Sequence, residues 1–306
     1  MMKARRDKNN RMFHELAADL AKVRPGSADT MCCPLCLREF TMETIGELSL
    51  EHAIPSALGG TVETLTCKVK CNNRQGSKLD SHLVAAMKAV DGMEGKEPMK
   101  MRLDAGGGHI AGEVFWTNGG KETPRTFRIS RKASNPNAVS ALRSNLADHS
   151  EFSVHINFGF NATNYWRAAI RAAYLSVFSV YGYEYAFSEG AAQVRRVLSE
   201  EAPVLDTVVM EAFPEQEPPD GPLIMPGSFN DVGQFIAALL PLGKKHKRYL
   251  TVFLPGKAGC EWSSLGLLYK HAPRLRFETT PATWKTKLFI HLNFDPVRRL
   301  QESASW

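Results

Sequence analysis

Two cysteine pairs carry the clearest chemical signal in this 306-residue sequence. Cys33 and Cys36 form a CPLC motif, and Cys67 and Cys71 form a CKVKC motif further along the chain. The CxxC spacing lets two thiolates of one tight turn bind one zinc ion, and four thiolates complete a tetrahedral structural site. We therefore expect these four cysteines to bind a structural Zn²⁺ with no open position for chemistry. Cys32 is an alternative to Cys33 as the first ligand.

An acidic residue and a histidine lie between the two pairs, in the segment LSLEHAIPSALGG at 48–60. Leu48 to Leu50 reads as a strand that leads into Glu51 and His52, and the two glycines at the end of the segment turn the chain back. A single histidine in an apolar setting is usually structural. Here it follows a carboxylate within a zinc-stapled hairpin, which makes it a candidate for proton transfer.

The motifs CPLC, EHAIPSALGG and CKVKCNNRQGSK, in this order, resemble those of the HNH nuclease family. The resemblance covers about residues 30–92. It implies a ββα-metal fold, in which two strands and a helix surround one divalent metal ion, stapled by the four-cysteine zinc site.

The resemblance also implies a role for each matching residue. His52 would be the general base that takes a proton from the attacking water. Glu51 and Asn72 would be oxygen ligands of a catalytic Mg²⁺ or Mn²⁺ ion, which prefers such ligands. Arg74 and Lys78 would contact the phosphates of the substrate.

The sequence departs from the family pattern in two places. The middle asparagine of the family is missing, since residues 62–64 are Val-Glu-Thr, and Glu63 or Thr64 is a possible substitute. The CKVKC motif has one residue more than CxxC, so Asn73 is an alternative to Asn72. His82, on the same expected helix, is interpreted mainly as a supporting or surface residue.

Composition limits the remaining possibilities. The chain is 43% hydrophobic and 23% charged, as in soluble globular proteins, and its net charge of +6 permits a polyanionic partner such as DNA. No apolar run approaches the ~20 residues of a membrane span, and the segment MMKARRDKNNRM is not followed by a signal-peptide core. Clustered cysteines fit a reducing compartment. We expect a cytoplasmic protein with no membrane partner, and the sequence carries no signal for an oligomeric state.

The spacing of apolar residues predicts the helices and strands that position these side chains. We expect an α+β fold in three parts: a basic N-terminal arm and helix (1–30), the HNH module (31–95) and a mixed α+β domain for substrate binding or specificity (96–306). Residues 163–181 form the strongest helix, with an apolar stripe and with Arg167 and Arg171 on its flank, facing phosphate or solvent. The expected helices are 10–23, 76–90, 135–147, 163–181 and 185–199; the expected strands fall in 99–132, 152–158, 249–255, 275–279 and 287–294, and 213–228 is an expected loop.

The leading hypothesis is a metal-dependent HNH endonuclease that hydrolyses phosphodiester bonds in DNA. The alternative is a non-catalytic zinc module that binds nucleic acid or a protein. The missing middle asparagine favours the alternative, while Glu51, His52 and Asn72 favour the nuclease, because a zinc staple needs none of them. An RNA substrate is a weaker possibility, since the sequence has no RNA-binding motif.

Overall fold

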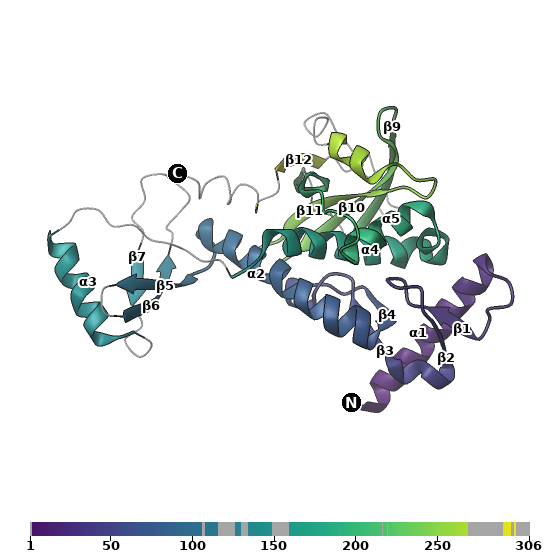
Figure 1. Cartoon of the computed structure of the whole chain (residues 1–306), viewed down its shortest axis with the longest axis horizontal. Helices are drawn as coiled ribbons and strands as arrows, with labels where there is room; N and C mark the ends of the chain where they lie inside the picture. The colour runs from purple at the N-terminus through teal and green to yellow at the C-terminus, as the bar shows by residue number, and fades with distance from the viewer. Residues whose placement is uncertain are drawn as a thin grey trace. The chain divides into compact units, whose positions relative to one another are not determined.

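Contacts within the chain divide the computed structural model into two units, one formed by Met1–Val84 with Asn161–Trp306 and the other by Ala85–Phe160. The expected boundary near residue 95 falls inside the second unit, and residues 161–306 pack with the N-terminal residues. Figure 1 shows the elements in chain order. The structure describes residues 2–105, 108–115, 126–129, 134–148, 159–215, 217–218, 220–268, 290–294 and 297.

The unit Ala85–Phe160 contains a three-stranded antiparallel sheet in the order β5-β6-β7. The helix α3 contacts β5 and β6. The expected meander and the expected helix at 135–147 are therefore confirmed, while the strand expected at 152–158 lies outside the described residues. The bounds are Met99–Ala105 for β5, Gly108–Phe115 for β6, Thr126–Ile129 for β7 and Pro136–Asp148 for α3.

The N-terminal helix α1 spans Met2–Val23, so it begins well before the expected residue 10. The basic residues of the expected N-terminal arm belong to the first turns of this helix. Phe13, Ala17 and Leu20 are buried on one face, as their spacing predicts. Helix α1 contacts the strand β1 and the helix α4, which places it inside the larger unit.

Two short antiparallel pairs and a helix follow α1. The first pair is β1 (Thr30–Cys32) with β2 (Glu39–Thr41), and the CPLC turn lies between these strands. The second pair is β3 with β4, in which Leu48 lies opposite Cys67 and His52 opposite Glu63. The hairpin leads directly into helical chain. The bounds are Leu48–His52 for β3, Glu63–Cys67 for β4, Lys68–Gly76 for the π-helix η3 and Ser77–Met93 for α2.

The π-helix between β4 and α2 contains the CKVKC motif after its first cysteine. A π-helix closes hydrogen bonds over five residues and is rare, occurring mostly as short insertions near functional sites. The extra residue between Cys67 and Cys71 falls in this segment. The wider π-turn therefore accommodates the insertion that made the sequence register uncertain.

A five-stranded antiparallel sheet in the order β12-β8-β11-β10-β9 forms the other half of the larger unit. The strand β9 (Leu223–Phe229) overlaps the expected loop at 213–228, so that expectation is wrong for its last six residues. Pro226 fits there because β9 is an edge strand, where a missing N–H costs little. The expected strand at 275–279 lies outside the described residues. The bounds are Val209–Pro214 for β8, Leu223–Phe229 for β9, Gly233–Leu242 for β10, Arg248–Pro255 for β11 and Ile290–Phe294 for β12.

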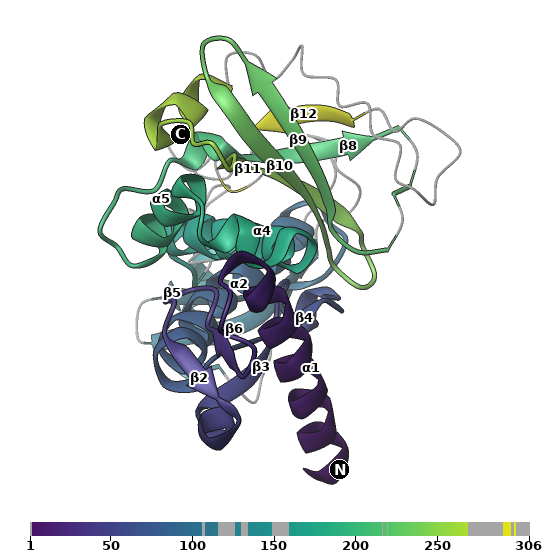
Figure 2. The same cartoon turned by 90° about the vertical axis from the view of Figure 1, so that its right-hand side faces the viewer.

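The helix α4 (Ala162–Ala186) packs between this sheet and the N-terminal elements. It contacts β10 and β11 as well as α1 and β4, and Figure 2 shows α4 and α5 (Glu189–Leu198) along the sheet. Gly182 bends α4 at a left-handed φ of 58°, and a Cβ atom there would overlap the Asp19 carboxylate. Among the described helices, none has the length and apolar character needed to cross a bilayer.

Candidate metal centre and hairpin site

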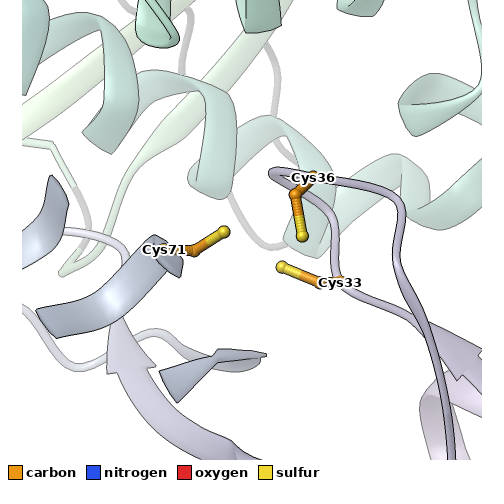
Figure 3. Close-up of side chains that lie close together, drawn as sticks. All are labelled: Cys33, Cys36 and Cys71. Atoms are coloured by element: carbon orange, nitrogen blue, oxygen red, sulfur yellow. The ribbon is translucent and has the colours of Figure 1, made fainter. Parts of the chain in front are cut away.

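Three thiols gather where the CPLC turn meets the π-helix, as Figure 3 shows. The sulfur atoms of Cys33, Cys36 and Cys71 all lie within 4.8 Å of one another. Sulfur atoms bound to one tetrahedral zinc ion at about 2.3 Å are about 3.8 Å apart, so this spacing fits a shared ion. These three residues, here called the cysteine cluster, can hold a metal ion.

Backbone hydrogen bonds shape the CPLC turn. The N–H of Cys33 donates to the carbonyl of Arg38 at 2.9 Å, and the N–H of Leu37 donates to the carbonyl of Cys33 at 2.8 Å. Leu37 adopts a left-handed φ of 57°, an uncommon conformation for a residue other than glycine. The turn is thereby closed tightly enough for the sulfur atoms of Cys33 and Cys36 to point together toward Cys71.

Cys67 is the one expected zinc ligand whose thiol lies outside the cluster. Its backbone N–H donates to the sulfur of Cys33 at 3.3 Å. The backbone of Cys67 therefore adjoins the cluster, although its thiol is not one of the three close sulfurs. Cys32, the sequence alternative, instead packs in an apolar group with Leu20 and Phe178.

Hydrogen bonds among the clustered thiols separate their pKa values. Hydrogen bonds from Cys33 and Cys71 hold the pKa of Cys36 well below its ordinary value. Burial raises the pKa of Cys33 to about 11, and hydrogen bonds to the other two thiols raise the pKa of Cys71. The thiolate form is favoured at Cys36, and a cation between the three sulfurs would compensate the charge of further thiolates.

Tyrosine side chains of α4 attach the cysteine-bearing turn to the rest of the unit. The Tyr174 hydroxyl donates to the carbonyl of Pro34 at 2.7 Å and accepts from Arg195 at 3.1 Å. The Tyr183 hydroxyl accepts from the N–H of Cys32 at 2.9 Å and donates to the carbonyl of the same residue. Both hydroxyls are fully buried, so these bonds satisfy groups that water cannot reach.

The expected metal ligand Glu51 is buried against an arginine of α4. Its Oε1 atom accepts from Nη2 of Arg171 at 2.7 Å, and the two side chains are 7% and 1% exposed. The same guanidinium reaches the carbonyl of Cys71 at 3.4 Å and the carboxylate of Asp80 at 3.5 Å. Burial raises the pKa of Asp80 to about 6, although Arg171 opposes this shift. One cation therefore joins β3, the π-helix and α2.

Asn72, and not Asn73, faces the hairpin. Its Nδ2 atom donates to the Ser49 hydroxyl at 2.8 Å and to the Leu50 carbonyl at 3.4 Å. Asn73 is exposed, and its backbone carbonyl accepts from the Ser77 hydroxyl. Because the amide nitrogen is fixed on β3, the orientation of the amide oxygen of Asn72 is fixed as well.

His52 lies opposite Glu63 at the end of the hairpin. Its Nε2 atom is 3.5 Å from Oε1 of Glu63, and the imidazole is 36% exposed. The other carboxylate oxygen of Glu63 forms an ion pair with Lys8 of α1. The residue found where the family asparagine is missing therefore contacts the expected general base, while Thr64 is buried in β4.

The other expected site residues divide into three cases. The side chain of Arg74 lies outside the described residues. Lys78 is exposed on α2. The Nδ1 atom of His82 accepts from the backbone N–H of Asn161 at 3.0 Å, and its Nε2 atom lies 3.2 Å from Nδ2 of Asn164. His82 therefore contacts the start of α4, which fits a supporting role.

A pocket of about 370 Å³ lies between the loop that follows His52 and the turn between β10 and β11. The N–H of Gly243 donates to the carbonyl of Leu58 at 2.8 Å, which joins these two segments. Lys244 and Lys247 contribute to the pocket wall from the basic run 244–248. Lys247 is paired with Glu217 and Asp220, so part of the positive charge is compensated.

The surroundings of Arg171 differ from those that its position in the sequence predicts. Its flank position on the apolar helix predicts contact with phosphate or solvent, as for Arg167, but both are buried. Arg167 donates to the carbonyl of Val197 at 3.1 Å and pairs with Glu200. A buried arginine requires a partner, so an arginine beside an apolar stripe predicts a carboxylate or carbonyl partner, but not which one.

No protein-family model, curated protein or solved structure matches this chain.

Proposed function

We propose that the chain is a metal-dependent endonuclease that hydrolyses phosphodiester bonds in DNA and that resembles the HNH family. The observation that supports this most is the arrangement of β3, β4 and the following helix. Glu51 and His52 end the first strand, and Asn72 is bonded to that strand from the beginning of the helical chain. A structural zinc staple alone requires none of these three side chains.

The oxygen atoms near the hairpin end fit a hard divalent cation. Oε1 of Glu51 is taken by Arg171, and among the described residues its Oε2 atom has no hydrogen-bond partner. The amide oxygen of Asn72 is likewise free, since the amide nitrogen makes the bonds to β3. We assign these two oxygens as the protein ligands of Mg²⁺ or Mn²⁺. Such an ion would stabilise negative charge on the phosphate and on the leaving 3′ oxygen.

His52 is the proposed general base. Its Nε2 atom lies toward Glu63, which leaves Nδ1 as the nitrogen that accepts a proton from the attacking water. The Glu63 carboxylate orients the ring and stabilises the imidazolium that forms. The pair of Glu63 with Lys8 holds that carboxylate in place from α1.

The metal of the cysteine cluster is proposed to be zinc, with Cys67 as the fourth ligand. Thiolates favour zinc over Mg²⁺ or Mn²⁺, and a closed set of four leaves no position for substrate. This ion therefore fixes the CPLC turn to the π-helix that carries Asn72. Arg74 and Lys78 remain the proposed phosphate contacts.

The test is the conversion of supercoiled plasmid to nicked or linear DNA by the full-length protein. We expect cleavage with Mg²⁺ or Mn²⁺ and none with EDTA, while a single-stranded RNA of similar length stays intact. An RNA product under the same conditions would move the proposal to an RNA substrate. Absence of cleavage with either metal, in protein that retains one zinc per chain, would contradict the proposed activity.

A non-catalytic zinc module that binds nucleic acid or a protein is the second candidate. The ion pair of Glu51 with Arg171 favours it, because the pair neutralises an acid that the nuclease needs as a metal ligand. This candidate predicts binding of duplex DNA, measured by fluorescence anisotropy, that is unchanged by Mg²⁺ and is not followed by cleavage.

A further inference from the structure

Arg171 links three elements around the proposed catalytic site to the C-terminal half of the chain. Its guanidinium contacts Glu51 on β3, the carbonyl of Cys71 directly before Asn72, and Asp80 on α2. It belongs to α4, which lies far from these elements in the sequence. The Arg171 side chain is 1% exposed and has three protein partners, whereas an arginine in a surface ion pair has one partner and is otherwise hydrated.

We propose that Arg171 is a positioning residue that orients the Glu51 carboxylate for a divalent cation. The inference rests on the proposed function, because it takes Glu51 as a ligand of that cation. The short bond to Nη2 fixes Oε1 and so restricts rotation of the carboxylate. Oε2 is then presented in one direction, and the cation is bound through one oxygen.

Electrostatics explains why the position requires an arginine. The carboxylates of Glu51 and Asp80 lie 2.7 Å and 3.5 Å from the Arg171 guanidinium, so one cation between them compensates both charges. A planar guanidinium bonds in several fixed directions at once, while an ammonium acts as a point charge. Lysine at this position keeps the charge but cannot hold the two carboxylates and the Cys71 carbonyl together.

Gly76 leaves room for the ion pair of Arg171 with Glu51 because it has no side chain. A Cβ atom at Gly76 would lie 2.8 Å from Nη2 of Arg171 and 2.9 Å from Oε1 of Glu51. Gly76 lies at the end of the π-helix, where an alanine would otherwise suit helical chain better than glycine. An alanine here therefore displaces the ion pair without removing any charged group.

The chain offers a matched control in Arg167, one helical turn before Arg171. Arg167 is also buried, at 8% exposure, and forms bonds to the Val197 carbonyl and to Glu200. None of these partners belongs to the hairpin or to α2. A variant of Arg167 therefore measures the effect of losing a buried arginine of α4, without loss of the contact with Glu51.

The experiment is a titration of the full-length protein with Mn²⁺ in zinc-saturated form, followed by electron paramagnetic resonance. We expect one Mn²⁺ site that Glu51→Gln removes. Arg171→Lys and Gly76→Ala should each raise the dissociation constant for Mn²⁺ by about tenfold or more, as loss of an orienting partner does at other metal sites. Arg167→Lys should leave it within about twofold of the parent value.

Each outcome separates the inference from the proposed function. Mn²⁺ bound through Glu51 with unchanged affinity in Arg171→Lys and Gly76→Ala would overturn the inference and leave the nuclease proposal intact. An equal loss of affinity in Arg167→Lys would also overturn it, since the effect would then be general destabilisation. A parent protein with no Mn²⁺ site sensitive to Glu51→Gln would overturn both. Thermal melts of all variants show which of them fold.

Discussion

The cysteine cluster and the hairpin site, formed by Glu51, His52 and Asn72, share the same short elements but are held in different ways. The cluster is assembled almost entirely from local structure, namely one turn closed by its own backbone and one π-helix. The hairpin site depends on side chains distant in sequence. Glu51 is bonded to α4, and the partner of His52 is itself bonded to α1.

The two regions therefore differ in how much they depend on elements distant in the sequence. The ligands of the cluster come from two short segments, whereas the hairpin site also has partners on α1 and α4. The buried tyrosines of α4 extend the same dependence to the CPLC turn, through Pro34 and Cys32. Variants should therefore damage the two regions to different extents.

The largest expected effect is loss of the cluster. Cys33→Ser should remove the bound zinc and lower the free energy of unfolding on the order of 5 kcal/mol, because binding of a structural ion contributes directly to folding. Cys67→Ser should weaken zinc binding less, since its thiol lies outside the cluster. Zinc content by mass spectrometry and chemical denaturation measure both effects.

Cys260→Ser is the control for these two variants, because Cys260 is buried elsewhere and its carbonyl accepts from Gln193. It should retain zinc. Full zinc occupancy in Cys33→Ser would contradict the assignment of the cluster, and unchanged zinc affinity in Cys67→Ser would exclude it as the fourth ligand.

The next effect concerns the loop that follows His52. A Cβ atom at Gly60 would lie 1.8 Å from the carbonyl oxygen of Ile54, so Gly60→Ala has to rearrange this loop. We expect a loss of about 2–3 kcal/mol in the free energy of unfolding. Gly46→Ala, where nothing lies within 4 Å of the added carbon, should change it by less than about 0.5 kcal/mol. Equal effects in the two variants would show that the loop is not packed as described.

A smaller effect is expected from the partner of the proposed base. Glu63→Gln keeps the size of the side chain but removes the charge beside His52, so cleavage should slow by roughly tenfold with zinc content unchanged. Initial rates of plasmid nicking at saturating metal measure this. Glu47→Gln, which removes only an exposed pair with Arg38, should cleave at the parent rate. If Glu63→Gln cleaves as fast as Glu47→Gln, the assignment of Glu63 as the partner of His52 is wrong.

The smallest effect is a pH dependence of stability. Burial raises the pKa of Asp80 to about 6 from 3.8, so the folded protein retains a proton that the unfolded chain releases between these values. The stability contributed by protonated Asp80 is therefore lost as the pH rises from about 4 to about 6, by about 1–2 kcal/mol for this partly exposed group.

Asp80→Asn should remove this slope. Denaturation at pH 4.5 and pH 7.0 should show the parent protein losing stability relative to Asp80→Asn, while Glu43→Gln, an exposed acid, follows the parent protein. Parallel behaviour of all three proteins would mean that Asp80 ionises normally between Arg171 and Glu51.

The sequence was informative wherever the determinants are local. Spacing predicted the gathering of Cys33, Cys36 and Cys71, the buried stripe of α4 and the meander. It could not give the pairing of the C-terminal strands, because an edge strand containing Pro226 reads as a loop. It also left the role of Arg171 undetermined, since a flank position on a helix does not say which distant acid will meet it.

The register at the end of the cysteine motif shows the same limit. Because the cysteine motif has one inserted residue, the sequence allows either Asn72 or Asn73 as the metal ligand. The π-helix places Asn72, and not Asn73, against β3. Similarly, the strand register of β3 with β4 brings Glu63 to His52, where the sequence offered either Glu63 or Thr64.

The most direct test of the central claim is single-turnover cleavage of duplex DNA by His52→Ala beside the parent protein, both with one zinc per chain and saturating Mn²⁺. The account predicts that His52→Ala is at least about 10²-fold slower, as expected for loss of a general base, while its zinc content and thermal melt are unchanged. Cleavage by His52→Ala at the parent rate would contradict the assignment of the base and the hydrolytic mechanism built on it.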